Sequence, residues 1–375
     1  MILKCTSFEG MQREIVGRDM SIVVFGAGVI GTVTVPEILR RYDLLGRVAF
    51  YVDNGPNIQG RRITLQDRSV DVKPAKALNG AKDNTVLIIA VSRYAEIVSQ
   101  LERMPRMRDM SCYLMPMMCI HNFCSDISGG EPILSDKPLI PKKIHYMWLG
   151  KKQIPPSLQR CIDSWKKYCP DYEIMQWDEN NYDVEKHVYM KEAYKQGAYG
   201  FVPDYARLGI LYRHGGIYMD TDVEVVKNLD PLLCQEAFCG VEKWQVVNFG
   251  GCSGTIKGHR MIGEFLKARK DVLFLDAEGN TNRMTCGFYD TNTAIKNGYQ
   301  INGLTQNMQG MNLYAFDYFH PYDHMSGHTY MTEHTYTVHR FNGGWLDEKM
   351  KLANRETMWE YDRIYELAGQ NGRNA

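Results

Sequence analysis

The stretch FVPDYARLGILYRHGGIYMDTDV, residues 201–223, predicts a helix, a tight turn, a strand and an acidic pair in immediate succession. Pro203 in the first turn, apolar residues at helical spacing and two glycines at the end predict a helix that stops at the glycines. The apolar residues 217–219 then predict a short buried strand. Asp220 and Asp222 follow it and share one side of an extended chain, in which side chains alternate between faces. A helix that leads directly into a buried strand is typical of an α/β fold.

The acidic pair is the first candidate for chemistry. Two carboxylates on residues roughly 7 Å apart at Cα repel each other unless a cation or hydrogen-bond donors neutralise them. Hard oxygen ligands suit Mg²⁺ or Mn²⁺, and such ions usually also contact a substrate phosphate. For a D-x-D pattern taken alone, a turn in which both carboxylates cap backbone amides in water is the alternative interpretation.

A second charged pair, Asp204 and Arg207, lies on one face of the predicted helix because the two residues are three positions apart. One interpretation is structural: the acidic residue complements the helix dipole and pairs with a surface arginine. The other is that the pair holds sugar hydroxyls, because a carboxylate accepts hydrogen bonds and a guanidinium donates them. Since open α/β sheets bind ligands at the carboxyl ends of their strands, both charged pairs are expected to converge there.

Composition and charge exclude several classes of protein. The 375 residues are enough for two domains with real cores. Lys plus Arg and Asp plus Glu both number 44, so the chain has no overall basic charge for binding nucleic acid. The ten cysteines show no paired C-x-x-C spacing for zinc. With neither a signal-peptide pattern nor ~18 consecutive apolar residues, we expect a cytoplasmic protein.

The two parts of the chain differ in pattern. SIVVFGAG (21–28), RVAFYVDN (47–54) and NTVLIIAVS (84–92) are apolar runs that alternate with helical segments, which predicts a Rossmann-like parallel sheet covered on both faces. A segment rich in Ser, Gly and Pro ends this region, so we predict a first domain at 1–136 and a second at 137–375. The second domain ends in a predicted packing helix, for which a peripheral contact with the inner face of a membrane stays open.

Gly26, Gly28 and Gly31 form the pattern G-x-G-x-x-G between a predicted strand and a predicted helix. Asp53 ends the next predicted strand, where an acidic residue can contact a ribose. The loop could hold a nucleotide phosphate, or its glycines could serve only a tight strand-to-helix turn. Ligand binding here would make the chain an NAD- or nucleotide-binding oxidoreductase or sensor. No Tyr-x-x-x-Lys signature for hydride transfer accompanies the loop.

Four motifs occur in order along the second domain: IPKKIHYMWLG, DYEIMQWDEN, the stretch quoted above and YTVHRFNGGW. Together they resemble the DXD-containing glycosyltransferase family (family 32-like) that includes capsular-polysaccharide transferases and yeast-type mannosyl and galactosyl transferases. The resemblance covers residues 139–345. The first domain resembles small Rossmann-like domains that are fused to bacterial surface-sugar enzymes.

The resemblance implies a GT-A fold for the second domain, with a nucleotide-sugar donor, a Mn²⁺ (or Mg²⁺) cofactor and retention of the anomeric configuration. The implied reaction is that of a hexosyltransferase, with UDP-glucose or UDP-galactose as the favoured donor. The implied acceptor is a hydroxyl of a glycan or lipid-linked glycan in the synthesis of surface polysaccharide, either capsular polysaccharide or lipopolysaccharide. The sequence does not choose between uridine and guanosine donors or among glucose, galactose and mannose, and it leaves the exact acceptor, the linkage and the oligomeric state open. A non-catalytic sugar-binding module is a third hypothesis, against which both aspartates of the D-x-D pattern are present.

The motifs also imply which residues bind the donor. This set comprises Trp148, Asp204, Arg207, Tyr218, Asp220 and Trp345. Trp148 is expected to stack on the base, Tyr218 to lie at the ribose side and Trp345 to close over the diphosphate. Trp148 could equally be a packed core aromatic. Many relatives have Ser before the last tryptophan where this chain has Gly344, so a hydroxyl contact there is missing.

Two smaller sets carry the implied chemistry. The catalytic set is Asp204, Arg207 and Asp220. The metal set is Asp220, Asp222 and His339, in which the histidine resembles the late histidine that completes the metal site of related transferases. The alternative for His339 is a strand histidine with ordinary hydrogen bonds.

Overall fold

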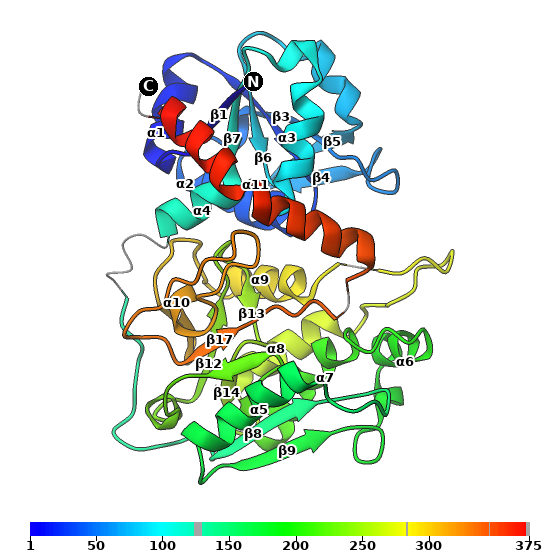
Figure 1. The fold of residues 1–375 in the computed structure, drawn as a ribbon, viewed down its shortest axis with the longest axis vertical. Helices are drawn as coiled ribbons and strands as arrows, with labels where there is room; N and C mark the ends of the chain where they lie inside the picture. Colours follow the sequence, from blue (N-terminus) through cyan, green and yellow to red (C-terminus); the bar gives the residue numbers. More distant parts are fainter. Residues whose placement is uncertain (124–129, 283, 345, 373–375) are drawn as a thin grey trace.

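The computed structural model describes residues 1–123, 130–282, 284–344 and 346–372, with side chains described as far as residue 369. Two units lie one above the other along the long axis of the molecule, and each is built around its own β-sheet (Figure 1). The upper unit contains the N-terminal part of the chain. The lower unit contains the D-x-D stretch.

The first unit is a mainly parallel sheet with helices on both faces. Its strand order is β1-β7-β6-β2-β3-β5-β4, and among these strands only β4 and β5 pair antiparallel in the part of the chain that the structure describes. The strands are β1 (Ile2–Lys4), β2 (Ser21–Phe25), β3 (Val48–Val52), β4 (Arg62–Leu65), β5 (Arg68–Lys73), β6 (Thr85–Ile89) and β7 (Ser111–Leu114). The helices are α1 (Phe8–Gly17), α2 (Val35–Arg41), α3 (Tyr94–Glu102) and α4 (Met115–Phe123). Ile22 and Val24 of β2 share a buried cluster with α1 and α2, whereas Val23 and Phe25 share one with α3.

The C-terminal helix α11 (Glu348–Gly372) also packs on this first sheet (Figure 1). Its buried residues Tyr361, Ile364 and Ala368 belong to the same apolar cluster as Leu3 of β1 and Val98 of α3. The sequence predicts this helix as part of the second domain. In the structure it instead crosses back and packs on the first unit. The domain division at residue 137 itself stays a prediction.

Ile364→Ala is expected to lower the free energy of unfolding by about 2–5 kcal/mol, because it leaves a cavity where a fully buried side chain joins α11 to the sheet. Leu352→Ala, at an exposed position of the same helix, should change it by less than about 0.5 kcal/mol. Denaturant unfolding followed by circular dichroism measures both variants. Equal effects of the two substitutions would contradict the docking of α11.

The second unit is built on a mixed sheet with the order β15-β16-β12-β14-β10-β8-β9, and β13 pairs with β12. Neighbours β9, β8 and β10 are parallel, whereas β14 runs antiparallel to both β10 and β12. A separate two-stranded ladder joins β11 to β17. The strands are β8 (Lys143–Met147), β9 (Glu173–Trp177), β10 (Gly216–Tyr218), β11 (Val223–Val225), β12 (Ala237–Val241), β13 (Val247–Asn248), β14 (Ser253–Thr255), β15 (Gln306–Met308), β16 (Met311–Tyr314) and β17 (Thr337–His339). The helices are α5 (Pro156–Tyr168), α6 (Val188–Lys195), α7 (Val202–His214), α8 (Arg260–Arg269), α9 (Cys286–Lys296) and α10 (Phe316–Phe319).

The predicted helix and strand of the D-x-D stretch are confirmed as α7 and β10. The helix ends where Gly215 adopts a φ of 66°, a conformation that favours glycine. A Cβ at this position would also lie only 2.9 Å from the carbonyl oxygen of Thr255. Because β10 runs parallel to β8, the carboxyl ends of both strands open at the same edge of the sheet.

The α/β class expected from the sequence is confirmed in both units. Parallel strands dominate the first sheet, and the second combines parallel and antiparallel neighbours. Within the described parts of the chain, none of the helices combines the length and the apolarity of a membrane span.

Candidate active site

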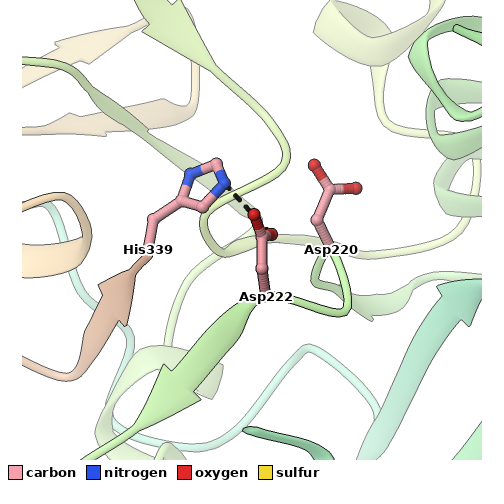
Figure 2. Close-up of side chains that lie close together, drawn as sticks. All are labelled: Asp220, Asp222 and His339. Atoms are coloured by element: carbon pink, nitrogen blue, oxygen red, sulfur yellow. Dashed lines mark ion pairs between the residues drawn. The ribbon is translucent and has the colours of Figure 1, made fainter. Parts of the chain in front are cut away.

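The two aspartates of the D-x-D pattern lie in the turn between β10 and β11, beyond the end of the buried strand. The amide of Val223 donates to the carbonyl of Asp220 at 3.1 Å, so these residues form a turn and not an extended chain. The expected reason for the two carboxylates to share one side, strand alternation, is therefore wrong. The turn itself brings them close to each other (Figure 2).

His339 reaches the aspartates from a distant part of the chain. It ends β17, which pairs antiparallel with β11 so that His339 lies opposite Val223. Its Nε2 is 3.3 Å from Oδ1 of Asp222 (Figure 2). Asp220, Asp222 and His339 each offer a ligand atom within 4.8 Å of the other two. Two carboxylates and one imidazole suit a divalent cation, so these residues fit the metal that the sequence predicts.

Burial and charge act against each other in this cluster. Burial alone would raise the pKa of Asp222, but His339 and the amide of Asn342, which donates at 2.8 Å, hold that pKa below its usual value. Burial alone would lower the pKa of His339, but Asp222 raises it. Each residue thus favours the charged form of the other, and a metal ion would take the place of a proton on the imidazole.

Asp204 and Arg207 are buried, which excludes the interpretation of a surface ion pair. Nη2 of Arg207 lies 2.9 Å from Oδ1 of Asp204 and 3.4 Å from Oδ1 of Asp220. Burial alone would lower the pKa of Arg207, but the carboxylates of Asp220 and Asp204 hold it well above its usual value. One guanidinium therefore connects the first turn of α7 to the D-x-D turn, and both charged pairs meet at the end of β10, as the sequence analysis expected.

Tyr218, the last residue of β10, is fully buried beneath this guanidinium. The Cζ of Arg207 lies 5.5 Å from the centroid of the tyrosine ring. Burial also raises the pKa of Tyr218 well above its usual value, so the phenol stays neutral. The tyrosine ring therefore packs against the guanidinium of Arg207. Its expected contact with a ribose stays a prediction.

A segment that the sequence did not predict packs against Asp220. The amide of Asp220 donates to the carbonyl of Gly250 at 2.8 Å, and the amide of Gly250 donates to Oδ1 of Asn248 at 2.7 Å. A Cβ on Gly250 would lie only 2.1 Å from Oδ2 of Asp220. Backbone therefore packs directly on this carboxylate. The adjacent glycines 250 and 251, which follow a short apolar run, are the sequence signal that could have pointed to a close approach.

Of the two tryptophans implied to bind the donor, only Trp148 is among the residues that the structure describes. Trp148 follows β8 at the same sheet edge as the D-x-D turn, is partly exposed and donates its indole N–H to the carbonyl of Lys152 at 2.6 Å. Its stacking on a base stays a prediction. Trp345 lies outside the described residues.

The glycine loop of the first unit is explained by its own packing. Oδ2 of Asp53 accepts from the amide of Ala27 at 2.8 Å, and Oδ1 accepts from the amide of Gly55 at 2.7 Å. Gly26 has a φ of 106°, and a Cβ on Gly31 would lie 1.9 Å from the carbonyl oxygen of Gly26. The loop thus uses its acidic residue and two glycines to close a strand-to-helix turn, without any need for a nucleotide. Around Gly28, a Cβ would meet nothing within 4 Å.

His145 of β8 lies next to β10 and is fully buried. The indole of Trp177 donates to its Nδ1 at 3.2 Å, so its Nε2 carries the proton and donates to the carbonyl of Gly215 at 2.9 Å. Burial lowers the pKa of His145 from 6.5 to about 4. Between about pH 4 and pH 6.5, the imidazole of His145 is therefore neutral in the folded chain and protonated in the unfolded chain.

Stability is accordingly expected to fall as the pH drops from about 6.5 toward about 4, by about 3 kcal/mol from His145 alone. Over this range the unfolded chain binds a proton that the folded chain does not, and the loss is complete once both forms are protonated. Urea unfolding of the wild type and of His145→Gln, which keeps a donor and an acceptor, measures this contribution. An identical pH dependence of the two proteins would exclude His145 as its source.

The segment that carries the D-x-D turn matches a known protein family. Residues 155–239 match the family model described as "Glycosyltransferase sugar-binding region containing DXD motif". The match spans the Asp204–Arg207 pair and both aspartates of the D-x-D turn. The family resemblance predicted from the sequence is thereby confirmed for this region.

Two curated relatives each match about a third of the chain. Inositol phosphoceramide mannosyltransferase 1 of Schizosaccharomyces pombe is 28% identical over 121 residues, which are 30% of this chain and 38% of that protein. Mannosyl phosphorylinositol ceramide synthase SUR1 of Saccharomyces cerevisiae is 32% identical over 133 residues, which are 32% of this chain and 34% of that protein. The chain therefore spans only about a third of the length of these relatives.

Solved structures with some likeness include the PaToxG glycosyltransferase, at 15% identity and a TM-score of 0.34, covering 55% of this chain and 77% of that one. Galactosyltransferase LgtC, in complex with donor and acceptor sugar analogues, is 16% identical with a TM-score of 0.32, covering 61% and 95%. Because both scores are low, the fold described above rests on the strand order of this chain.

Proposed function

We propose that this chain is a metal-dependent glycosyltransferase of the DXD-containing family, whose second unit is of GT-A type and moves a hexose from a nucleotide-sugar to a hydroxyl group. One observation carries the proposal. The cluster of Asp220, Asp222 and His339 adjoins the buried pair of Asp204 and Arg207, and four of these five residues lie in the segment that matches the DXD region.

In this proposal one set of residues binds the metal and another binds the transferred sugar. Asp222, Asp220 and His339 would hold Mn²⁺ or Mg²⁺, whose charge stabilises a diphosphate as it leaves. Asp204 accepts hydrogen bonds from hydroxyls of the transferred sugar, and Arg207 fixes the carboxylates of Asp204 and Asp220 relative to each other. Retention of the anomeric configuration, by attack on the face that the diphosphate leaves, belongs to the same proposal.

The proposal names classes of donor and acceptor. UDP-glucose and UDP-galactose follow from the resemblance to capsular-polysaccharide transferases. The names of the yeast relatives add mannose as a transferred sugar, so GDP-mannose is the further donor to test. The same names add the inositol phosphate head group of a ceramide lipid to glycans and lipid-linked glycans as acceptors. A role in surface polysaccharide synthesis, in the cytoplasm with peripheral contact to the membrane, completes the proposal.

Metal removal tests the proposed function directly. The chain is incubated with UDP-glucose, UDP-galactose, UDP-N-acetylglucosamine or GDP-mannose, with Mn²⁺ or with EDTA, and the released nucleotide is quantified. We expect release from one donor, lowered about 100-fold or more by EDTA, because the diphosphate loses its counter-charge. Release at an equal rate in EDTA would refute metal dependence. Absence of both release and donor-induced thermal stabilisation would refute the transferase proposal itself.

A further inference from the structure

A second buried ion pair lies behind the first turn of α7. Arg269 ends α8 and Asp290 lies in α9, with side chains 5% and 2% exposed. Nε of Arg269 donates to Oδ1 of Asp290 at 3.0 Å, and Nη2 donates to Oδ2 of the same carboxylate. Two parallel hydrogen bonds of this kind fix the guanidinium plane as well as its position.

The same guanidinium also binds backbone on two other helices. Nη1 of Arg269 donates to the carbonyl of Asp204 at 2.7 Å, and Nη2 donates to the carbonyl of Cys286 at 3.2 Å. Arg269 therefore joins the end of α8 to the first turns of α7 and α9. Asp204 is held at its backbone by Arg269 and at its carboxylate by Arg207.

Stability alone is a weak reason for such a pair. Withdrawing two charges from water is unfavourable, and apolar side chains of similar volume often replace a buried ion pair without loss. What apolar side chains lack is a hydrogen bond to the backbone of Asp204 and a positive charge beside it. Burial raises the pKa of Asp204, and the charges of Arg207 and Arg269 oppose that rise. Arg269 thus contributes both placement and charge to a residue of the candidate active site.

We propose that Arg269 and Asp290 are positioning residues, which hold Asp204 in place for the sugar of a donor. They act through Asp204 and do not touch the donor themselves. The inference rests on the proposed function, because it assigns a donor sugar to Asp204.

The double variant Arg269→Met/Asp290→Leu removes both charges and keeps the volume similar. We expect the kcat of metal-dependent donor hydrolysis to fall about 10- to 100-fold, since slight misplacement of a sugar-binding group is enough for such a loss. Binding of UDP or GDP with Mn²⁺ should stay within about twofold, because these probes lack the sugar. Lys4→Met/Glu14→Leu removes another largely buried pair, in the first unit, and should leave both quantities unchanged.

Each outcome decides the proposal. Hydrolysis within about twofold of wild type in R269M/D290L would overturn it. So would a joint loss of nucleotide binding and of thermal stability, which a purely structural role predicts. If the wild-type chain hydrolyses no donor, hydrogen exchange reports the placement of Asp204 instead, and the proposed function has failed only if no donor stabilises the chain either. Faster exchange at residues 201–208 in R269M/D290L, but not in Lys4→Met/Glu14→Leu, supports the positioning role. Unchanged exchange in R269M/D290L refutes it.

Discussion

Asp222→Asn is expected to lower metal-dependent donor hydrolysis by about 10³-fold or more, and the affinity for Mn²⁺ by at least about 100-fold. Asparagine keeps the shape of the side chain and can still accept from the amide of Asn342, so the fold should be retained. It removes the negative charge that a divalent ion requires. His339 also loses the partner that raises its pKa. Calorimetric titration with Mn²⁺ and quantification of released nucleotide measure the two effects.

Glu224→Gln makes the same chemical change two residues further along the chain and serves as the matched control. Glu224 pairs with Arg340 in a partly exposed ion pair outside the metal cluster. This variant should therefore keep its affinity for Mn²⁺ and its turnover. Normal Mn²⁺ binding together with near-normal turnover in D222N would place the metal elsewhere in the chain.

Gly250→Ala is expected to lower turnover by about 100-fold, because a single methyl group would displace the carboxylate of Asp220. The new Cβ would lie 2.1 Å from Oδ2 of Asp220 and 2.8 Å from Nη1 of Arg207. The φ of Gly250 is not positive, so alanine itself fits the backbone. The reduced freedom of the unfolded chain contributes about 0.4–1 kcal/mol of stability, which offsets part of the roughly 1–3 kcal/mol that such overpacking costs. Turnover should thus fall about 100-fold in a protein that still folds.

Gly80→Ala isolates the effect of the added methyl group. A Cβ on Gly80 would meet nothing within 4 Å, and its φ is not positive either. Turnover of this variant should match the wild type. The comparison pairs kcat from donor hydrolysis with midpoints from thermal unfolding. If G250A and G80A turned over at equal rates, the close contact between Gly250 and Asp220 would have no part in the reaction.

Local parts of the candidate site were predictable because their physical causes act over a few residues. Pro203, the apolar spacing after it and Gly215 define α7, and the acidic pair follows β10 directly. The meeting of His339 with Asp222 is different in kind. It depends on the pairing of β17 with β11, strands more than a hundred residues apart, whose register no local pattern encodes. The family resemblance indicated this histidine, and the spacing of residues could not.

The second ion pair was not predicted because its proposed role depends on burial. Arg269 and Asp290 look like ordinary polar residues of amphipathic helices until packing withdraws both from water. Arg207 had two interpretations for the same reason: its burial against Asp220 excludes a surface ion pair, and its contact with a sugar stays a prediction. The C-terminal helix showed an apolar side in its sequence, but such a pattern does not identify the surface that covers it.

The return of α11 to the first sheet has a consequence for how the protein is made. The sheet residues that α11 covers, such as Leu3, are synthesised long before the helix. At ~5–20 residues per second, translation of the more than 200 residues between the end of α4 at Phe123 and the start of α11 at Glu348 takes roughly 10–45 s. Throughout that interval the apolar residues that α11 covers in the complete chain lack this cover. In chain topology, the second unit is an insertion within the first.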